Sequence, residues 1–174
     1  MLALAGATGC GYTFVGAAAS GEPGGPGGPG GPGGVTVAIR TFENSTAEPG
    51  AELVMTDALR RDLFDRPGVR VVPDSQDARW TVRGRVGDVR IRTETFSSVV
   101  LALEHSLTLR VSVEIRDPEG QELRLSESAL SATEVFLASA DVEVSRKNRA
   151  EALRRVAGLI ADRVGDALEL ETAP

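Results

Sequence analysis

The sequence predicts an α+β domain, a two-layer sandwich in which two helices pack on one face of a four-stranded, mostly antiparallel (mixed) sheet. Three observations lead to this fold class. Apolar and polar residues alternate in several segments after residue 35, as in strands with one buried face. Two other segments repeat apolar residues at helical spacing. The elements follow in the order strand, helix, strand, long strand, hairpin and helix, so we expect the second sheet face to be polar.

The first strand and the first helix are expected between residue 35 and Pro67. The segment VTVAIRTF places Val35, Val37 and Ile39 on one side of an extended chain. After the loop FENSTAEPG, the segment AELVMTDALRRDLFDR carries apolar residues at helical intervals and turns its charged residues away. Pro67 ends this helix, because the residue before a proline is driven out of the helical conformation.

A short strand, VRVV at 69–72, and a long strand, ARWTVRGRVGDVRIR at 78–92, are expected next. In the long strand the apolar alternation changes phase between Val86 and Val89. An extra residue in one strand shifts its alternation, so we predict a β-bulge at Gly87-Asp88. The glycines of GRVG at 84–87 therefore fit a bulged strand rather than a phosphate-binding loop.

A hairpin is the clearest element of the sequence. Apolar residues alternate with polar ones from Leu107 to Ile115, and the alternation resumes at Leu123 and Leu125. Between them, DPEG supplies the residues of a type I turn. We therefore expect two antiparallel strands with one solvated face.

The second helix is expected at the C-terminal end. The chain from Ala129 to Val144 has no legible pattern, but SRKNRAEALRRVAGLIADRVGDALEL carries apolar residues at helical intervals. Ser145 precedes this pattern and is predicted to be the N-cap. The cations that follow it would then oppose the helix dipole, which either a binding role or simple tolerance would explain.

Residues 1–34 have the composition of an anchor and a linker. Residues 1–9 are small and apolar, and we interpret them as the remaining part of a lipoprotein signal segment. Cys10 closes this run and precedes a glycine, which indicates a lipidation point; an incidental free cysteine is the alternative. Residues 10–34 contain four Pro-Gly-Gly units, which offer no side chain to bury and predict a linker. The folded domain is expected over 35–174.

Composition and charge argue against several classes of function. The 174-residue chain has a net charge of −6, which disfavours nucleic acid as a partner. Cys10 and His105 are its one cysteine and one histidine, so we expect no metal, no cofactor and no enzyme. No stretch reaches the roughly 18 consecutive apolar residues of a membrane-spanning helix. A periplasmic enzyme remains an alternative, which a deep pocket holding His105 and two carboxylates would favour.

Arginines are expected to gather on the polar face of the sheet. The alternation of the strands directs six of them there: Arg83, Arg85, Arg90, Arg92, Arg110 and Arg124. Guanidinium groups bind phosphate bidentately, so this patch predicts a site for an anionic, phosphate-bearing ligand. The alternative is an ordinary solvated face, in which Glu94, Glu114 and Glu122 pair with the arginines across the strands.

Several short motifs of the chain occur together in one known family. CGYTFVG, followed by VTVAIRTFENSTAEPGAELVMTDALRRDL, is similar to that family's opening: a Cys-Gly-Tyr/Phe start, a strand, a Phe-Glu-Asn-like loop and a first helix. DARWTVRGRV, the hairpin and NRAEALRRVAGLIADRVGDAL continue the similarity. In these motifs the chain resembles the LptE family of lipopolysaccharide-assembly lipoproteins.

Two departures from the family pattern stand out. The family's Ala-Asp order is Asp77-Ala78 here, and the Pro-Gly-Gly insert separates GYTFVG from the domain. The insert leaves open whether residues 11–16 pack on the domain as a strand.

The resemblance implies a function without catalysis. It implies two helices on a four-stranded sheet and an outer-membrane lipoprotein on the periplasmic side, anchored through palmitate or a similar acyl chain on Cys10. It also implies that the protein plugs and helps to assemble the LptD β-barrel and binds lipopolysaccharide, for which the six arginines are the candidates. The alternative function is a lipid-tethered periplasmic activator of a cell-wall synthase, reached through the linker.

Overall fold

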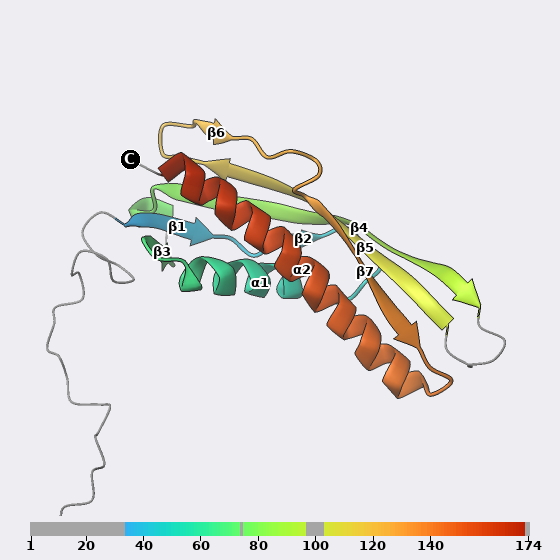
Figure 1. Ribbon diagram of the computed structural model, residues 1–174. Helices are drawn as coiled ribbons and strands as arrows, with labels where there is room; N and C mark the ends of the chain where they lie inside the picture. Colours follow the sequence, from blue (N-terminus) through green and yellow to red (C-terminus); the bar gives the residue numbers. More distant parts are fainter. Residues whose placement is uncertain (1–33, 74, 97–102, 173–174) are drawn as a thin grey trace, which may run out of the picture.

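The computed structural model describes residues 34–73, 75–96 and 103–172, which form one mixed sheet with two helices (Figure 1). In chain order the elements are β1 (Val35–Ile39), β2 (Glu43–Asn44), α1 (Ala51–Asp65), β3 (Val69–Val72), a 3-10 turn (Ser75–Asp77), β4 (Trp80–Phe96), β5 (Leu103–Arg116), β6 (Glu122–Leu123), β7 (Ser131–Ala138) and α2 (Val142–Thr172). Both helices lie on the same face of the sheet. The expectations for Cys10, for the linker and for residues 11–16 lie outside the described residues.

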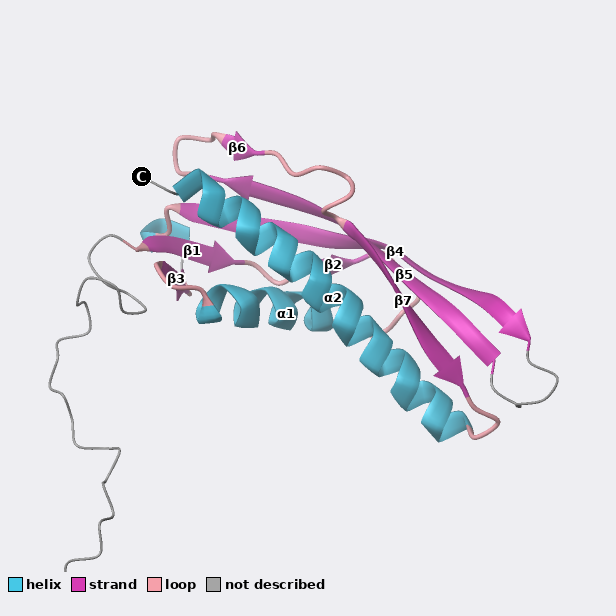
Figure 2. Ribbon diagram, in the orientation of Figure 1, coloured by secondary structure: helices cyan, strands magenta, loops and turns pink. Residues whose placement is uncertain are grey.

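The sheet is mixed, as predicted, and its α+β class is confirmed. Its strand order is β3-β1-β4-β5-β6, with β2 also on β4 and β7 also on β5. β1 is parallel to β3 and β4, whereas β5 is antiparallel to β4 and β7 (Figure 2). The sheet has seven strands rather than four, because β1 and β2 occupy successive parts of one edge of β4, and β6 and β7 do the same on β5.

The β-bulge predicted in the long strand is confirmed. The register between β4 and β5 shifts between Val86 and Asp88, which makes Gly87 the extra residue. The shift keeps Val86 on the buried face before the bulge and brings Val89 and Ile91 to the same face after it.

The hairpin turn is confirmed, but its second strand is shorter than predicted. The Gly120 amide donates to the Asp117 carbonyl at 3.1 Å, and Gly120 has a φ of +85°. The buried Asp117 carboxylate accepts the Gln121 amide at 2.7 Å and holds the turn. β6 then pairs over two residues only, and β7 forms the longer pairing with β5. β7 comes from the stretch without a legible pattern, since its inward residues include Ala132 and a charged Glu134.

The predicted N-cap of α2 is wrong. The helix begins at Val142, and the Asp141 carboxylate accepts the amides of Glu143 at 2.8 Å and Val144 at 3.2 Å. Ser145 lies inside the first turn, where its hydroxyl accepts the Ser139 amide instead. The sequence did not reveal that α2 begins at Val142, because its first residues are exposed and do not continue the helical spacing of apolar residues.

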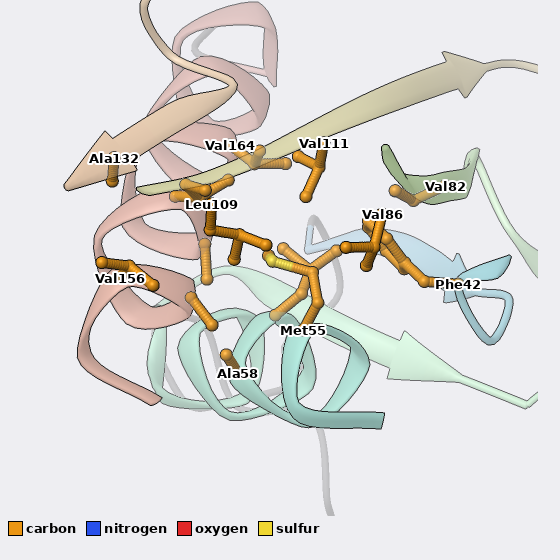
Figure 3. Close-up of a cluster of buried hydrophobic side chains, with 14 of the residues drawn as sticks. Phe42, Met55, Ala58, Val82, Val86, Leu109, Val111, Ala132, Val156 and Val164 are labelled. Atoms are coloured by element: carbon orange, nitrogen blue, oxygen red, sulfur yellow. The ribbon is translucent and has the colours of Figure 1, made fainter. Parts of the chain in front are cut away.

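The core lies between the sheet and both helices (Figure 3). Met55 and Leu59 of α1 and Val156 and Ile160 of α2 are fully buried against the inward valines and leucines of β4 and β5. Burying a side chain of this size contributes about 1.5–3 kcal/mol relative to exposure. The apolar stripe of each helix therefore explains why both are held on one face.

Two glycines allow the layers to approach closely. A Cβ on Gly84 of β4 would lie 2.2 Å from the ring of Phe42, which covers the strand at this point. A Cβ on Gly165 of α2 would lie 2.2 Å from Asp62 and 2.3 Å from Arg66 at the end of α1. Gly84 therefore leaves room for the ring of Phe42, which belongs to the segment linking β1 and β2. Gly165 leaves room for the Asp62–Arg66 ion pair at the end of α1.

None of the described helices has the length and apolar character needed to cross a membrane.

Candidate functional site

The candidate site is the outer face of the sheet, which we define as the face of β4 and β5 turned away from the helices. Residues directly opposite each other in an antiparallel pair point to the same face. Arg83 lies opposite Glu114, Arg90 opposite Thr108, and Asp88 opposite Arg110. Because Val82, Val86 and Leu109 of these strands are buried under the helices, the exposed residues between them form this outer face.

The structure brings five of the six predicted arginines onto the outer face. They are Arg83, Arg85, Arg90, Arg92 and Arg110. Arg124 is exposed, but it follows β6 in the connection to β7 and lies outside the paired strands. Its placement differs because the return strand of the hairpin ends at Leu123 rather than continuing as predicted.

Carboxylates pair with some of these arginines, although not in the predicted combinations. Arg85 contacts Glu43 through Nη2 at 2.6 Å and Nε at 2.9 Å, and Arg90 contacts Asp88 at 3.1 Å. Glu114 pairs with Arg116 of its own strand instead of with Arg83. Glu122 forms no ion pair with any described residue, and the Glu94 side chain lies outside the described part of the chain.

Three arginines keep their charge available. Within residues 34–73, 75–96 and 103–172, the side chains of Arg83, Arg92 and Arg110 make no ion pair or hydrogen bond. The paired arginines are also accessible, since about half of the Arg85 and Arg90 side chains is exposed (58% and 53%). Exposed pairs contribute only about 0–1 kcal/mol each, so a multiply charged anion would displace their carboxylates readily.

Arg83 lies between two shallow depressions of the outer face. One, of about 320 Å³, is lined by Thr81, Arg83, Arg116 and neighbouring residues. The other, of about 350 Å³, is lined by Arg83, Arg85 and Ser112 among others. Glu114 lines both depressions, so a carboxylate lies beside the guanidinium groups and hydroxyls. The guanidinium groups and hydroxyls match the phosphates and sugar hydroxyls of a ligand.

His105 does not belong to this face. It stacks on Phe136 with ring centroids 5.5 Å apart and approaches Thr93 Oγ1 at 3.3 Å, on the helix side of the sheet. The depression beside it, of about 380 Å³, has no carboxylate among its described lining residues. No group of three metal-ligating side chains occurs in the part of the chain that the structure describes. Among the described residues, the outer face therefore offers guanidinium groups and hydroxyls that can bind an anion.

Two residues of the outer face, Arg116 and Glu43, were not predicted from the sequence. Arg116 continues the polar alternation of β5, so its position was legible from the pattern that placed Arg110. Glu43 was not legible, because its pairing with Arg85 joins residues 42 positions apart through the β2–β4 contact.

These features define a two-layer α+β domain with helices on one face of its sheet and an open, arginine-rich opposite face. The family model LptE, described as lipopolysaccharide-assembly, matches residues 35–168. The chain belongs to the LptE family.

Solved structures share this fold at low sequence identity. A presumed lipoprotein from Caulobacter crescentus is similar with a TM-score of 0.51 and 16% identity, over 77% of this chain and 93% of that chain. A hypothetical protein from Chlamydia trachomatis gives a TM-score of 0.51 and 11% identity, over 78% of this chain and 98% of that one. No curated protein matches the chain.

Proposed function

We propose that this LptE-family protein is a subunit of the lipopolysaccharide transport and assembly machinery, anchored to the outer membrane on its periplasmic side by acylation of Cys10. In this role it plugs an LptD-like β-barrel and assists its assembly. It binds lipopolysaccharide through the outer face of the sheet. It performs no reaction, so its contribution is shape and charge.

The observation that carries the proposal is a set of arginines, Arg83, Arg92 and Arg110, that lie on the outer face of an LptE-family fold and form no ion pair with any described residue. Arg83 and Arg92 lie nine positions apart on β4, roughly 30 Å at about 3.3 Å per residue. Arg110 lies between them on β5, opposite Asp88. Cations spread over this length suit a large ligand with several phosphates better than a single small anion.

The partner is tested by a pull-down of the acylated protein in detergent at moderate salt, with the affinity tag at its C-terminus. We expect a stoichiometric outer-membrane β-barrel. Recovery of a cell-wall synthase would favour the activator function instead. Recovery of neither would remove the barrel role from the proposal.

Lipid binding is tested by reversing the unpaired charges. The variant Arg83→Glu/Arg110→Glu is expected to bind purified lipopolysaccharide at least about tenfold more weakly, since charge-assisted hydrogen bonds contribute about 1.5–3 kcal/mol each. Arg60→Glu/Arg61→Glu makes the same change of net charge on the exposed side of α1 and serves as the control. An equal loss in both variants would mean that net charge, and not the outer face, determines binding.

A further inference from the structure

The edge of β4 that faces away from β5 is covered along its first part only. β1 pairs with it from Trp80 to Val82, and β2 pairs at Arg85 and Val86. From Asp88 to Phe96 no strand in the described part of the chain pairs with this edge, and Figure 2 shows β4 continuing well past β2. Nine residues of extended chain measure roughly 30 Å at about 3.3 Å per residue.

The other edges of the sheet are short or covered. β3, at one edge, has four residues. β7, at the other, lies under α2, from which Asn148 donates to the Leu137 carbonyl at 2.8 Å and Arg163 donates to the Ser131 carbonyl at 2.8 Å. A long uncovered edge is a template for another strand, which is why proteins usually cover or shorten it. We call β4 residues 88–96 the distal edge of β4; among the described residues, nothing covers or shortens it.

The side chains along this edge alternate in chemistry. Arg90 and Arg92 point to the outer face, where Arg92 has no partner among the described residues and Arg90 has only the exposed pair with Asp88. Val89 and Ile91 point to the helix side and are half-buried against the core. An added strand with carboxylates on its outer side and apolar residues on its inner side would pair the arginines and finish burying the valine and isoleucine.

We propose that β4 residues 88–96 bind a β-strand of a partner protein, and that this strand alternates acidic and apolar residues. Main-chain hydrogen bonds would supply the pairing, and the alternation would supply the register. A second copy of this chain would bring Arg90 opposite Arg92 if the two β4 edges paired about Ile91, and Asp88 opposite Arg90 if they paired about Val89; in neither register does Arg92 meet a carboxylate of a described residue, so an acidic strand of a partner suits this edge better. This inference shares Arg90 and Arg92 with the proposed lipid binding, but it adds main-chain pairing along the edge of β4, whereas the lipid-binding test changes only Arg83 and Arg110.

Two synthetic ten-residue peptides test the proposal on the full chain: one alternating glutamate and valine, the other alternating lysine and valine. Hydrogen exchange read by mass spectrometry is expected to show new protection of residues 88–96 with the glutamate peptide and none with the lysine peptide. Fluorescence anisotropy of labelled peptides measures the affinities. The variant Arg90→Glu/Arg92→Glu should weaken binding of the glutamate peptide at least about tenfold and reverse the preference. Arg60→Glu/Arg61→Glu, with the same charge change on α1, should leave the preference unchanged.

Each remaining outcome would overturn the proposal. Protection of residues 88–96 without peptide would mean that the chain covers its own edge, or that a second copy does if the protection rises with protein concentration. Peptide binding without protection of this segment would place the peptide elsewhere. Protection that both charge variants leave intact would show that the acidic pattern plays no part. Loss of lipopolysaccharide binding in Arg83→Glu/Arg110→Glu would have no bearing on these results.

Discussion

Replacing Arg66 by methionine should destabilise the fold by disconnecting α1 from α2. The Arg66 guanidinium, at the end of α1, contacts Asp62 at 2.8 Å, Asp162 at 3.2 Å, and Asp166 and Glu169 at 2.9 Å each. It also donates to the Asp162 carbonyl at 2.8 Å. The hydrogen bonds with Asp62, first, and with Asp166 and Glu169 raise the pKa of the Arg66 guanidinium above its usual range against the opposing effect of burial. Methionine keeps most of the aliphatic volume but leaves four carboxylates without their shared cation.

The size of the effect follows from the exposure of each partner. Arg66 and Asp62 are only 12% and 19% exposed, so this charged hydrogen bond contributes about 1.5–3 kcal/mol. Asp162, Asp166 and Glu169 are 55–65% exposed, so each contributes a few tenths, about 1 kcal/mol together. We therefore expect a loss of about 3 kcal/mol, or roughly 10 °C in Tm for a chain of this length.

Urea unfolding followed by circular dichroism measures this loss, with the exposed Arg60→Met as the control that should change stability by less than about 0.5 kcal/mol. In the double variant Arg66→Met/Asp62→Asn the two losses should not add, leaving a coupling of about 1 kcal/mol or more. A loss below about 1 kcal/mol for Arg66→Met, or additive losses, would refute the assignment of Arg66 as the link between the helices.

Three further pairs of variants should change the stability of the fold in ways that the structure predicts. Gly165→Ala should destabilise the fold by about 1–3 kcal/mol, because the added methyl group meets Asp62 and Arg66. Gly158→Ala, also in α2, should stabilise it by about 0.5–1 kcal/mol, because no atom lies within 4 Å of the added methyl group. Chemical denaturation of both variants checks the opposite signs. Gly84→Ala should lower the free energy of unfolding by about 1–3 kcal/mol, because the added methyl group displaces the Phe42 ring. Gly87→Ala should lower it by less than about 1 kcal/mol, because the nearest atom to its methyl group is 3.8 Å away. Equal Tm values for the two variants would contradict the packing described. Asp141→Ala should lower stability by about 0.5–2 kcal/mol through loss of the α2 N-cap, and Asp141→Asn, which keeps the acceptor oxygen, should retain most of it in the same thermal scan.

The outer face and the distal edge of β4 divide the recognition chemistry of the sheet. Arg83 and Arg110 project from the face, with carboxylates beside them that are exposed and weakly held. Arg90 and Arg92 stand where the face meets the uncovered edge, so they are the arginines that a neighbouring strand would reach first. Variants of Arg83 and Arg110 therefore test lipid binding alone, whereas a variant of Arg90 and Arg92 changes both the face and the edge.

Local patterns in the sequence predicted much of this protein. The phase change between Val86 and Val89 located the β-bulge, and the residues of Asp117–Gly120 located the hairpin turn. The helical spacing of apolar residues identified both helices and their buried sides. These features depend on residues a few positions apart, whose conformational preferences and apolar periods act wherever the segment finally packs. The same alternation also predicted which arginines leave the core.

Contacts between distant residues decided the rest. The pairing of β7 with β5 uses a segment whose inward positions include small and charged residues, so its strand character depends on the partner strand and on the Arg155–Glu134 ion pair from α2. The availability of each arginine likewise depends on a neighbour that only the fold supplies, as Glu43 does for Arg85. Alternation places a side chain on a face of the sheet, but the charge that a ligand meets there depends on which carboxylates the folded chain brings within a few ångströms.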